Sequence, residues 1–194
     1  MPAAPLRLAV INSSVREGRF GPTVAHWFVA QAEQRADMKV DLIDLADHAL
    51  PHQLSHSPGK EVTALLGGVS PRLAEAEAFV VVTPEYNHSF PASLKNLIDW
   101  HYTQWQAKPV GFVSYGGLAG GLRSVEQLRP VFAELHAVTV RDCVSFHNVW
   151  SQFDESGTLT DPTAAGTAAK TLLDQLVWWG LALREAREKR PYSS

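Results

Sequence analysis

Short apolar runs alternate along the chain with stretches in which apolar residues recur at helical spacing. Four runs predict buried strands, at residues 6–12, 39–45, 78–83 and 109–117, and a short fifth strand is expected within 138–145. The run AFVVVT at 78–83 has no polar interruption before its last residue. Such a run is typical of a parallel strand that is covered on both faces.

Helical spacing predicts four long helices, over 21–36, 91–101, 122–135 and 163–187. Pro130 predicts a kink in the third of them. Strands that alternate with helices form βαβ units and a parallel sheet. The sequence therefore predicts one doubly wound α/β domain over residues 1–194, with helices on both faces of the sheet and no internal repeat.

The composition narrows the possible functions. Of the 194 residues, 45% are hydrophobic and 19% charged, which is typical of a globular protein. A net charge of −3 argues against a dedicated surface for nucleic acid or anionic membrane. We find no apolar run of the roughly 20 residues that span a bilayer, and no signal peptide pattern. The single cysteine, Cys143, fits a reducing compartment. We expect a cytoplasmic protein without nucleic-acid or membrane partners.

Polar and glycine-rich segments follow three of the predicted strands. They are NSSVREGRFGPT at 12–23, TPEYNHSF at 83–90 and SYGGLAGGLRS at 114–124. Ligands of open parallel sheets bind at the carboxyl ends of the strands. All three segments begin at that edge of the sheet, because each one follows the end of a strand. The sequence therefore predicts that they line one pocket.

The first segment has the composition of a phosphate site. Hydroxyls, two arginines and two glycines stand before a predicted helix, whose N-terminus attracts anions: Ser13, Ser14, Thr23, Arg16, Arg19, Gly18 and Gly21. The pattern is neither a Walker A sequence nor G-x-G-x-x-G, which argues against an NTPase and a standard dinucleotide fold. The alternative is a surface loop with a capping serine and two solvated arginines.

The second and third segments can meet a planar ligand. Pro84 is expected to end strand pairing, and Asn87 can bind a flat amide-like edge. Glu85 is expected to meet a backbone donor, a lysine or the partner subunit, because isolated buried charge is costly. Ser89 and Pro91 suit a helix start, so an ordinary capped turn is the alternative. Four glycines at 116–121 permit close approach of the backbone to a ligand.

Together the three segments resemble the NADPH-dependent FMN reductase family, a flavodoxin-like group that includes quinone, chromate and azo reductases. The similarity runs from about residue 6 to 145. It rests on PEYNHSFPASLKNLIDW, which matches P-E-Y-N…P…L-K-N…I-D, and on S-x-R…G-R-x-G before it and S-x-G-G…G-G…L-R after it. The resemblance implies a flavodoxin-like five-stranded parallel sheet in the order 2-1-3-4-5.

The resemblance also implies which residues bind FMN. The phosphate would be held by Ser14, Arg16, Arg19, Phe20 and Gly21. The isoalloxazine would be lined by Pro84, Glu85, Tyr86 and Asn87, and closed on its other side by Ser114, Gly116 and Gly117. Ser13 stands where the family usually has glycine, and a serine there is strained if the backbone needs a positive φ angle.

The activity implied is that of an NAD(P)H oxidoreductase. Hydride passes from NADPH or NADH to N5 of FMN, and a small acceptor (quinone, flavin, azo compound or chromate) is then reduced in a ping-pong cycle. The cofactor carries the chemistry, so no catalytic side chain is expected. Similar proteins are dimers or tetramers, with Lys95 and Asp99 on an interface helix. The alternatives are a flavin-binding electron carrier or redox sensor without NAD(P)H turnover, and a phosphate- or nucleotide-binding protein that has lost FMN.

Other candidate residues favour ordinary roles. His48, His52 and His56 recur every four residues, but nearby prolines oppose a helix there, so no metal site is expected. Trp178 and Trp179 are expected in the core and at a subunit interface. The aromatic residues beyond the signature are expected at a dimer contact, the alternative being a lid over the flavin: Trp100, Tyr102 and Trp105.

Overall fold

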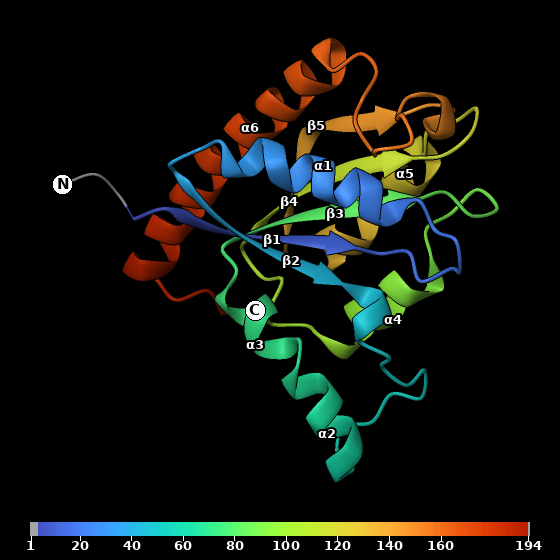
Figure 1. Cartoon of the computed structure of the whole chain (residues 1–194). Helices are drawn as coiled ribbons and strands as arrows, with labels where there is room; N and C mark the ends of the chain where they lie inside the picture. The colour runs from blue at the N-terminus through green and yellow to red at the C-terminus, as the bar shows by residue number, and fades with distance from the viewer. Residues whose placement is uncertain (1–3, 194) are drawn as a thin grey trace.

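The computed structural model describes residues 4–193. At its centre is a five-stranded sheet (Figure 1). The strands are β1 (Leu6–Asn12), β2 (Met38–Asp44), β3 (Ala78–Pro84), β4 (Pro109–Tyr115) and β5 (Val138–Phe146). All neighbouring pairs are parallel, in the order β2-β1-β3-β4-β5. The predicted doubly wound flavodoxin-like fold is confirmed.

Helices cover both faces of the sheet. One face packs against α1 (Gly21–Glu33) and α6 (Thr163–Lys189). The other packs against α3 (Ser70–Glu75), α4 (Ala92–Trp100) and α5 (Leu122–Glu134). A further helix, α2 (Lys60–Gly67), projects from the body of the molecule and buries none of its residues (Figure 1). Short 3-10 turns lie at η1 (Leu45–Asp47) and η2 (Val149–Ser151).

Strand β3 shows why its sequence is apolar up to Thr83. Val80 and Val82 belong to the core under α1 and α6, whereas Phe79 and Val81 belong to the core on the opposite face. Successive side chains of a strand point to opposite faces, so a sheet covered on both faces needs apolar residues at every position. All seven residues of β3 are buried.

Strand β3 ends at Pro84, as predicted, although Pro84 itself still lies in register with Tyr115. Two other local predictions were wrong. The N-cap of α4 is Pro91, not Ser89, whose hydroxyl bonds Gln127 instead. Trp105 is fully buried, with its ring centroid 4.7 Å from that of Phe79, and so cannot form a dimer contact.

The tryptophan pair of the last helix also differs from expectation. Trp178 is 64% exposed and Trp179 is 37% exposed, so neither belongs to the core. Their rings meet edge to face with centroids 5.0 Å apart.

In the described part of the chain, no helix is long and apolar enough to cross a bilayer.

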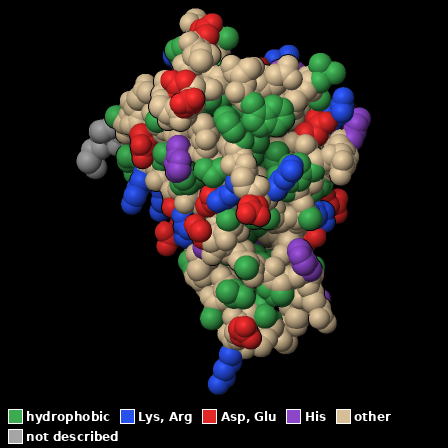
Figure 2. Space-filling view, turned by 45° about the vertical axis from the view of Figure 1, so that its right-hand side comes forward, with side chains coloured by type: hydrophobic (Ala, Val, Ile, Leu, Met, Phe, Trp, Pro, Cys, Tyr) green, Lys and Arg blue, Asp and Glu red, His purple; other side chains and the backbone are tan. Residues whose placement is uncertain are grey.

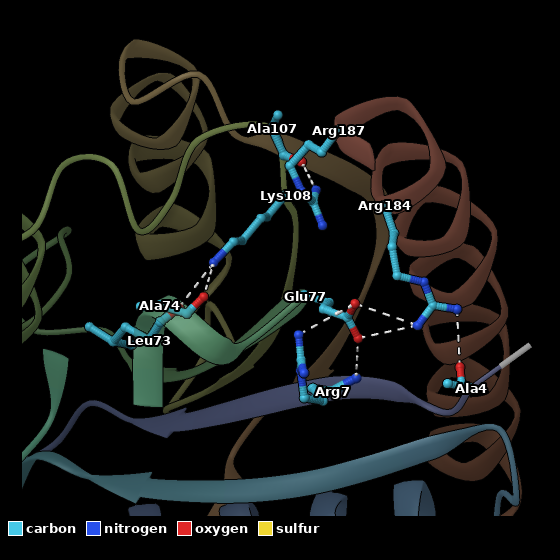
Figure 3. A network of polar contacts seen from close by, with 9 residues as sticks. All are labelled: Ala4, Arg7, Leu73, Ala74, Glu77, Ala107, Lys108, Arg184 and Arg187. Atoms are coloured by element: carbon cyan, nitrogen blue, oxygen red, sulfur yellow. Dashed lines mark hydrogen bonds and ion pairs between the residues drawn. The ribbon is translucent and has the colours of Figure 1, made fainter. Parts of the chain in front are cut away.

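A network of charged groups joins α6 to the edge of the sheet where the strands begin (Figure 3). The buried carboxylate of Glu77 accepts from the backbone N–H of Arg7 at 3.0 Å and pairs with Arg184 at 3.4 Å. Lys108, 8% exposed, donates to the carbonyls of Leu73 and Ala74 at 3.1 and 2.9 Å. Burial, with the charges of Arg187 and Arg7, lowers the pKa of Lys108 to about 8.

The Lys108 shift predicts that stability rises with pH above about 8. Below that pH the folded protein buries the charged ammonium, so the full free-energy cost of burying this charge lowers its stability. Between about 8 and the ordinary 10.5, the unfolded chain binds the proton more tightly, so rising pH favours the fold. We expect Lys108 to contribute a rise of up to about 3 kcal/mol in the free energy of unfolding across this window.

The measurement is urea unfolding of the wild type and of Lys108→Met between pH 7 and 10.5. Methionine keeps the length and apolar stem but does not titrate, so the difference between the two curves isolates the ammonium. That difference should change with pH in favour of the wild type. A constant difference would contradict the prediction.

Candidate functional site

The three predicted segments meet in one cavity at the carboxyl edge of the sheet. The cavity has a volume of about 350 Å³, within the size range of small-molecule sites. It is lined by Arg16, Glu17, Gly18, Arg19, Phe20, Pro84, Glu85, Tyr86, Tyr115, Gly116, Gly117 and Trp150. The cavity therefore lies where the loops after β1, β3 and β4 meet. Ligands of doubly wound sheets bind at this edge of the sheet.

The first loop begins in a fixed position. Ser13 donates from both its backbone N–H and its hydroxyl to the carbonyl of Val82, at 3.0 and 2.8 Å. Ser93, on α4, donates to the carbonyl of Ser13 at 2.6 Å. Ser13 is not among the described residues with positive φ, so its backbone does not require glycine. The serine costs no strain here and ties the loop to the end of β3.

Arg19 holds the same loop against the end of β2. Its Nη1 donates to the carbonyl of Ser14 at 2.6 Å and to Asp44 at 2.5 Å. Asp44 also accepts from the side-chain amide of Asn12 at 2.9 Å. Burial raises the pKa of Asp44, but the hydrogen bonds from Arg19, the Ala46 amide and Asn12 outweigh it, so that pKa lies below its ordinary value. Part of the Arg19 guanidinium is therefore already committed.

Arg16 is free to meet a ligand. It lines the cavity, it is exposed, and its side chain has no partner among the described residues. From Ser14 to Phe20, within the described chain, the backbone N–H of Arg19 is also the only one that donates to a protein acceptor. The loop thus offers several unused donors and one unpaired guanidinium, an arrangement that suits an anion.

Three buried polar atoms beside this loop make no hydrogen bond within the described chain: Oδ1 of Asn12, Oγ of Ser14 and the hydroxyl of Tyr115. They converge on Gly21, where an added Cβ would lie 2.4, 2.5 and 2.8 Å from them. Burial raises the pKa of Tyr115 well above its ordinary value. The nearby Ser14 hydroxyl opposes the shift, although the two do not meet hydrogen-bond geometry.

Unsatisfied buried polar groups are rare in folded proteins. Here they stand at the first residue of α1, whose N-terminus favours negative charge. Oδ1 of Asn12 can only accept a hydrogen bond, but the hydroxyls of Ser14 and Tyr115 can donate to a phosphate. These two hydroxyls and the unused N–H groups of the loop fit the phosphate group that the sequence pattern predicts.

The second loop is a tight turn. Tyr86 and Ser89 pair as an antiparallel bridge, with N–H to carbonyl distances of 2.9 and 3.1 Å. The two residues between them, Asn87 and His88, have φ of 52° and 72°. Positive φ at both central residues is the geometry of a type I′ turn, which asparagine tolerates well. Asn87 is exposed and is not among the residues that line the cavity.

Glu85 links the second loop to the third. Its carboxylate accepts from the guanidinium of Arg123 at 2.9 Å and from the backbone N–H of Arg123 at 3.3 Å. That N–H belongs to the first turn of α5, which has no side-chain cap of its own. The prediction that Glu85 meets a backbone donor is confirmed, and the carboxylate also favours the positive end of α5.

The third loop is held by the hydroxyls of three serines. Ser114 and Ser145 both donate to the carbonyl of Gly120, at 2.8 and 2.9 Å. Ser124 donates to the carbonyls of Pro84 and Ser89, at 2.9 and 2.6 Å. These bonds fix the second and third loops relative to one another, so the wall of the cavity is set before any ligand arrives.

Eight of the twelve predicted site residues line the cavity: Arg16, Arg19, Phe20, Pro84, Glu85, Tyr86, Gly116 and Gly117. The other four do not. Ser14, Gly21 and Ser114 are buried behind it, and Asn87 is exposed at the turn.

Sequence reasoning assigned no role to Glu17, Tyr115 and Trp150, which line the cavity, whereas Gly18 was already a candidate of the first segment. Tyr115 stands between two predicted residues, so its position was a usable signal. Trp150 had none, because it follows β5 and lies outside the motifs.

The histidine series does not form a metal centre. His48 and His52 line a separate hollow of about 270 Å³ beside Val15 and α4. Among the described residues, no group of three or more histidine, cysteine or acidic side chains is placed to hold a metal ion.

Comparison with known proteins identifies the family. Residues 6–151, which are most of the chain, match the family profile described as NADPH-dependent FMN reductase. The chain belongs to this family. An NAD(P)H-dependent FMN reductase of Schizosaccharomyces pombe is 37% identical over 125 residues, which are 59% of this chain and 60% of that protein. A 2-hydroxy-1,4-benzoquinone reductase of a Burkholderia species is 31% identical over 133 residues, 68% of this chain and 67% of its own.

A solved structure supports the same fold. The flavoenzyme NAD(P)H:(acceptor) oxidoreductase of Paracoccus denitrificans superposes with a TM-score of 0.68 over 91% of this chain and 98% of its own. Because its sequence identity to the chain is 22%, the likeness bears on the fold alone.

Proposed function

We propose that this member of the family is an FMN-dependent NAD(P)H oxidoreductase that reduces a small acceptor, with quinones as the first class to test. The convergence of the three loops on one cavity, with the unpartnered Ser14 hydroxyl beside it, carries the proposal. The name of the Burkholderia relative supports a quinone as acceptor.

The first loop would hold the phosphate of FMN. Arg16 supplies an unpaired positive charge, the unused backbone N–H groups supply donors, and the Ser14 hydroxyl supplies one more. Arg19 contributes in two ways. It lines the cavity, and through Ser14 and Asp44 it fixes the loop in the shape that the phosphate needs. We expect Phe20 and Gly21 to complete the turn into α1.

The second and third loops would hold the ring. Pro84, Tyr86 and Glu85 form one wall, and Gly116 and Gly117 let the backbone approach on the other side. Ser114 and Asn87 act from outside the cavity lining, the first by fixing the Gly120 carbonyl and the second at the turn. FMN held here would supply the hydride transfer between NAD(P)H and the acceptor. No side chain of the cavity is needed as a general acid or base.

The proposal also covers the location and the oligomeric state of the protein. We expect the protein in the cytoplasm, as a homodimer or homotetramer. Lys95 and Asp99 form an ion pair at 2.7 Å on the outer side of α4, the helix expected at the subunit interface.

The mechanism is tested by initial rates of NADPH oxidation at several fixed concentrations of a soluble 1,4-naphthoquinone. Ping-pong turnover predicts parallel double-reciprocal lines, because the nicotinamide leaves before the acceptor binds. Intersecting lines would contradict the ping-pong order. Bound FMN that NADPH leaves oxidised would favour the electron-carrier alternative.

A further inference from the structure

Trp150 stands at the outer lip of the cavity without a structural reason. It belongs to η2, just after β5, and is 66% exposed. It lines the same cavity as the three loops. A Cβ added to Gly117 would lie 3.9 Å from Cζ3 of Trp150, so the indole reaches the glycine floor of the site.

The indole does not hold the fold together. Within the described chain, its ring makes no aromatic contact, and its N–H makes no hydrogen bond. Its position is instead set by the backbone. The N–H groups of Asn148 and Val149 donate to the carbonyls of Gly117 and Gly116, at 2.9 and 3.0 Å, and the Val149 side chain is fully buried. The chain therefore holds a large apolar ring beside the cavity and leaves it uncovered.

Leu118, which follows Gly117 in the chain, is 85% exposed, although it is not among the residues that line the cavity. Figure 2 turns the side of the molecule where the strands end toward the viewer, and hydrophobic side chains gather on the upper part of that face. An exposed apolar group at the rim of a cavity indicates a binding role more strongly than one isolated on a surface. Trp178 provides the contrast, because it is 64% exposed but lies on α6, away from the lining of this cavity.

We infer that Trp150 is a specificity-determining residue that packs its indole face against the planar ring of the acceptor. The inference rests on the proposed function. The residues expected to hold the cofactor come from loops that are buried or braced by hydrogen bonds, whereas Trp150 is at the exposed end of the site. A ligand that enters and leaves at each turnover needs a preformed face open to solvent. Tryptophan provides a broad rigid face at low conformational cost.

The experiment compares Trp150→Ala, Trp150→Phe and the control Trp178→Ala, each as the full chain loaded with FMN. Two acceptors are used with NADPH, a 1,4-naphthoquinone and ferricyanide, because ferricyanide takes electrons without a flat ring to stack. Loss of the stacking face should raise KM for the naphthoquinone about five- to tenfold in Trp150→Ala. Trp150→Phe should recover most of the wild-type value. The ferricyanide rate, the Kd for FMN and the Trp178→Ala variant should be unchanged.

Several results would overturn the inference. An unchanged naphthoquinone KM would do so, as would an equal loss with both acceptors accompanied by weaker FMN binding, which would make Trp150 a cofactor contact. A change in oligomeric state of Trp150→Ala by light scattering would assign the indole to a second copy of the chain. If the wild type itself is not reduced by NADPH, the proposed function fails and the inference falls with it. If the wild type turns over and Trp150→Ala behaves like it, the inference alone is wrong.

Discussion

Replacing Gly21 with alanine is expected to lower the affinity for FMN about tenfold or more. The new Cβ would lie 2.4 to 2.8 Å from Asn12, Ser14 and Tyr115, too close for any of them to stay in place. All three atoms are buried, so the strain falls on the first loop, and the Ser14 hydroxyl leaves the position from which it would meet the phosphate. Fluorescence titration with FMN gives the dissociation constants of the wild type and of Gly21→Ala.

Gly166→Ala is the matched control. Gly166 also lies in a helix, α6, and a Cβ there would have no neighbour within 4 Å. Alanine is a better helix former than glycine, so this variant should be more stable by about 0.5–1 kcal/mol with FMN affinity unchanged. An FMN affinity of Gly21→Ala equal to that of the wild type would show that the first loop does not hold the phosphate.

Replacing Gly121 with alanine is expected to have the largest effect on stability. Gly121 has φ of 79°, and a Cβ there would lie 2.8 Å from Cβ of Ser114 and 2.8 and 2.9 Å from the backbone N and O of Tyr115. The neighbours are mostly backbone of β4 and cannot move aside. The strained φ and the overpacking together should lower the free energy of unfolding by about 3 kcal/mol. Urea unfolding without FMN measures this directly.

Gly157→Ala separates the two causes of that loss. Gly157 has nearly the same φ, 78°, but its nearest neighbour is Cγ2 of Thr23 at 3.4 Å. Its substitution should cost only the backbone strain, about 1–2 kcal/mol. Equal losses in the two variants would show that the close packing of the third loop against β4 has no energetic weight.

The fold was predictable because its signals are local. The central strands β3 and β4 are mostly apolar, and β1 begins and ends at the predicted residues 6 and 12, whereas β2 and β5 also carry charged residues. The two missed helices lack such a signal. Helix α2 has eight residues and α3 has six, which is too short for apolar spacing to identify a helix, and of the two only α3 buries a residue, Leu73. Their presence depends on the connection from β2 to β3, not on periodicity.

The site was predictable in composition but not in its division of labour. The first segment identified the right kinds of donor, yet the partner of Arg19 is Asp44, which is distant in sequence and arrives only through the pairing of β2 with β1. The bond from Glu85 to the first turn of α5 is likewise a tertiary contact. Trp150 follows β5, and the positions of Gly116 and Gly117 that bring it to the cavity are visible only in the folded chain.

The central claim is that this chain binds FMN in the cavity of the three loops and takes hydride from NAD(P)H. The most direct measurement is the visible absorption spectrum of the purified protein with FMN, before and after NADPH is added without oxygen. The account predicts flavin bands that shift on binding and then bleach within seconds. Bound flavin that NADPH leaves oxidised, or FMN that does not bind at all, would contradict it.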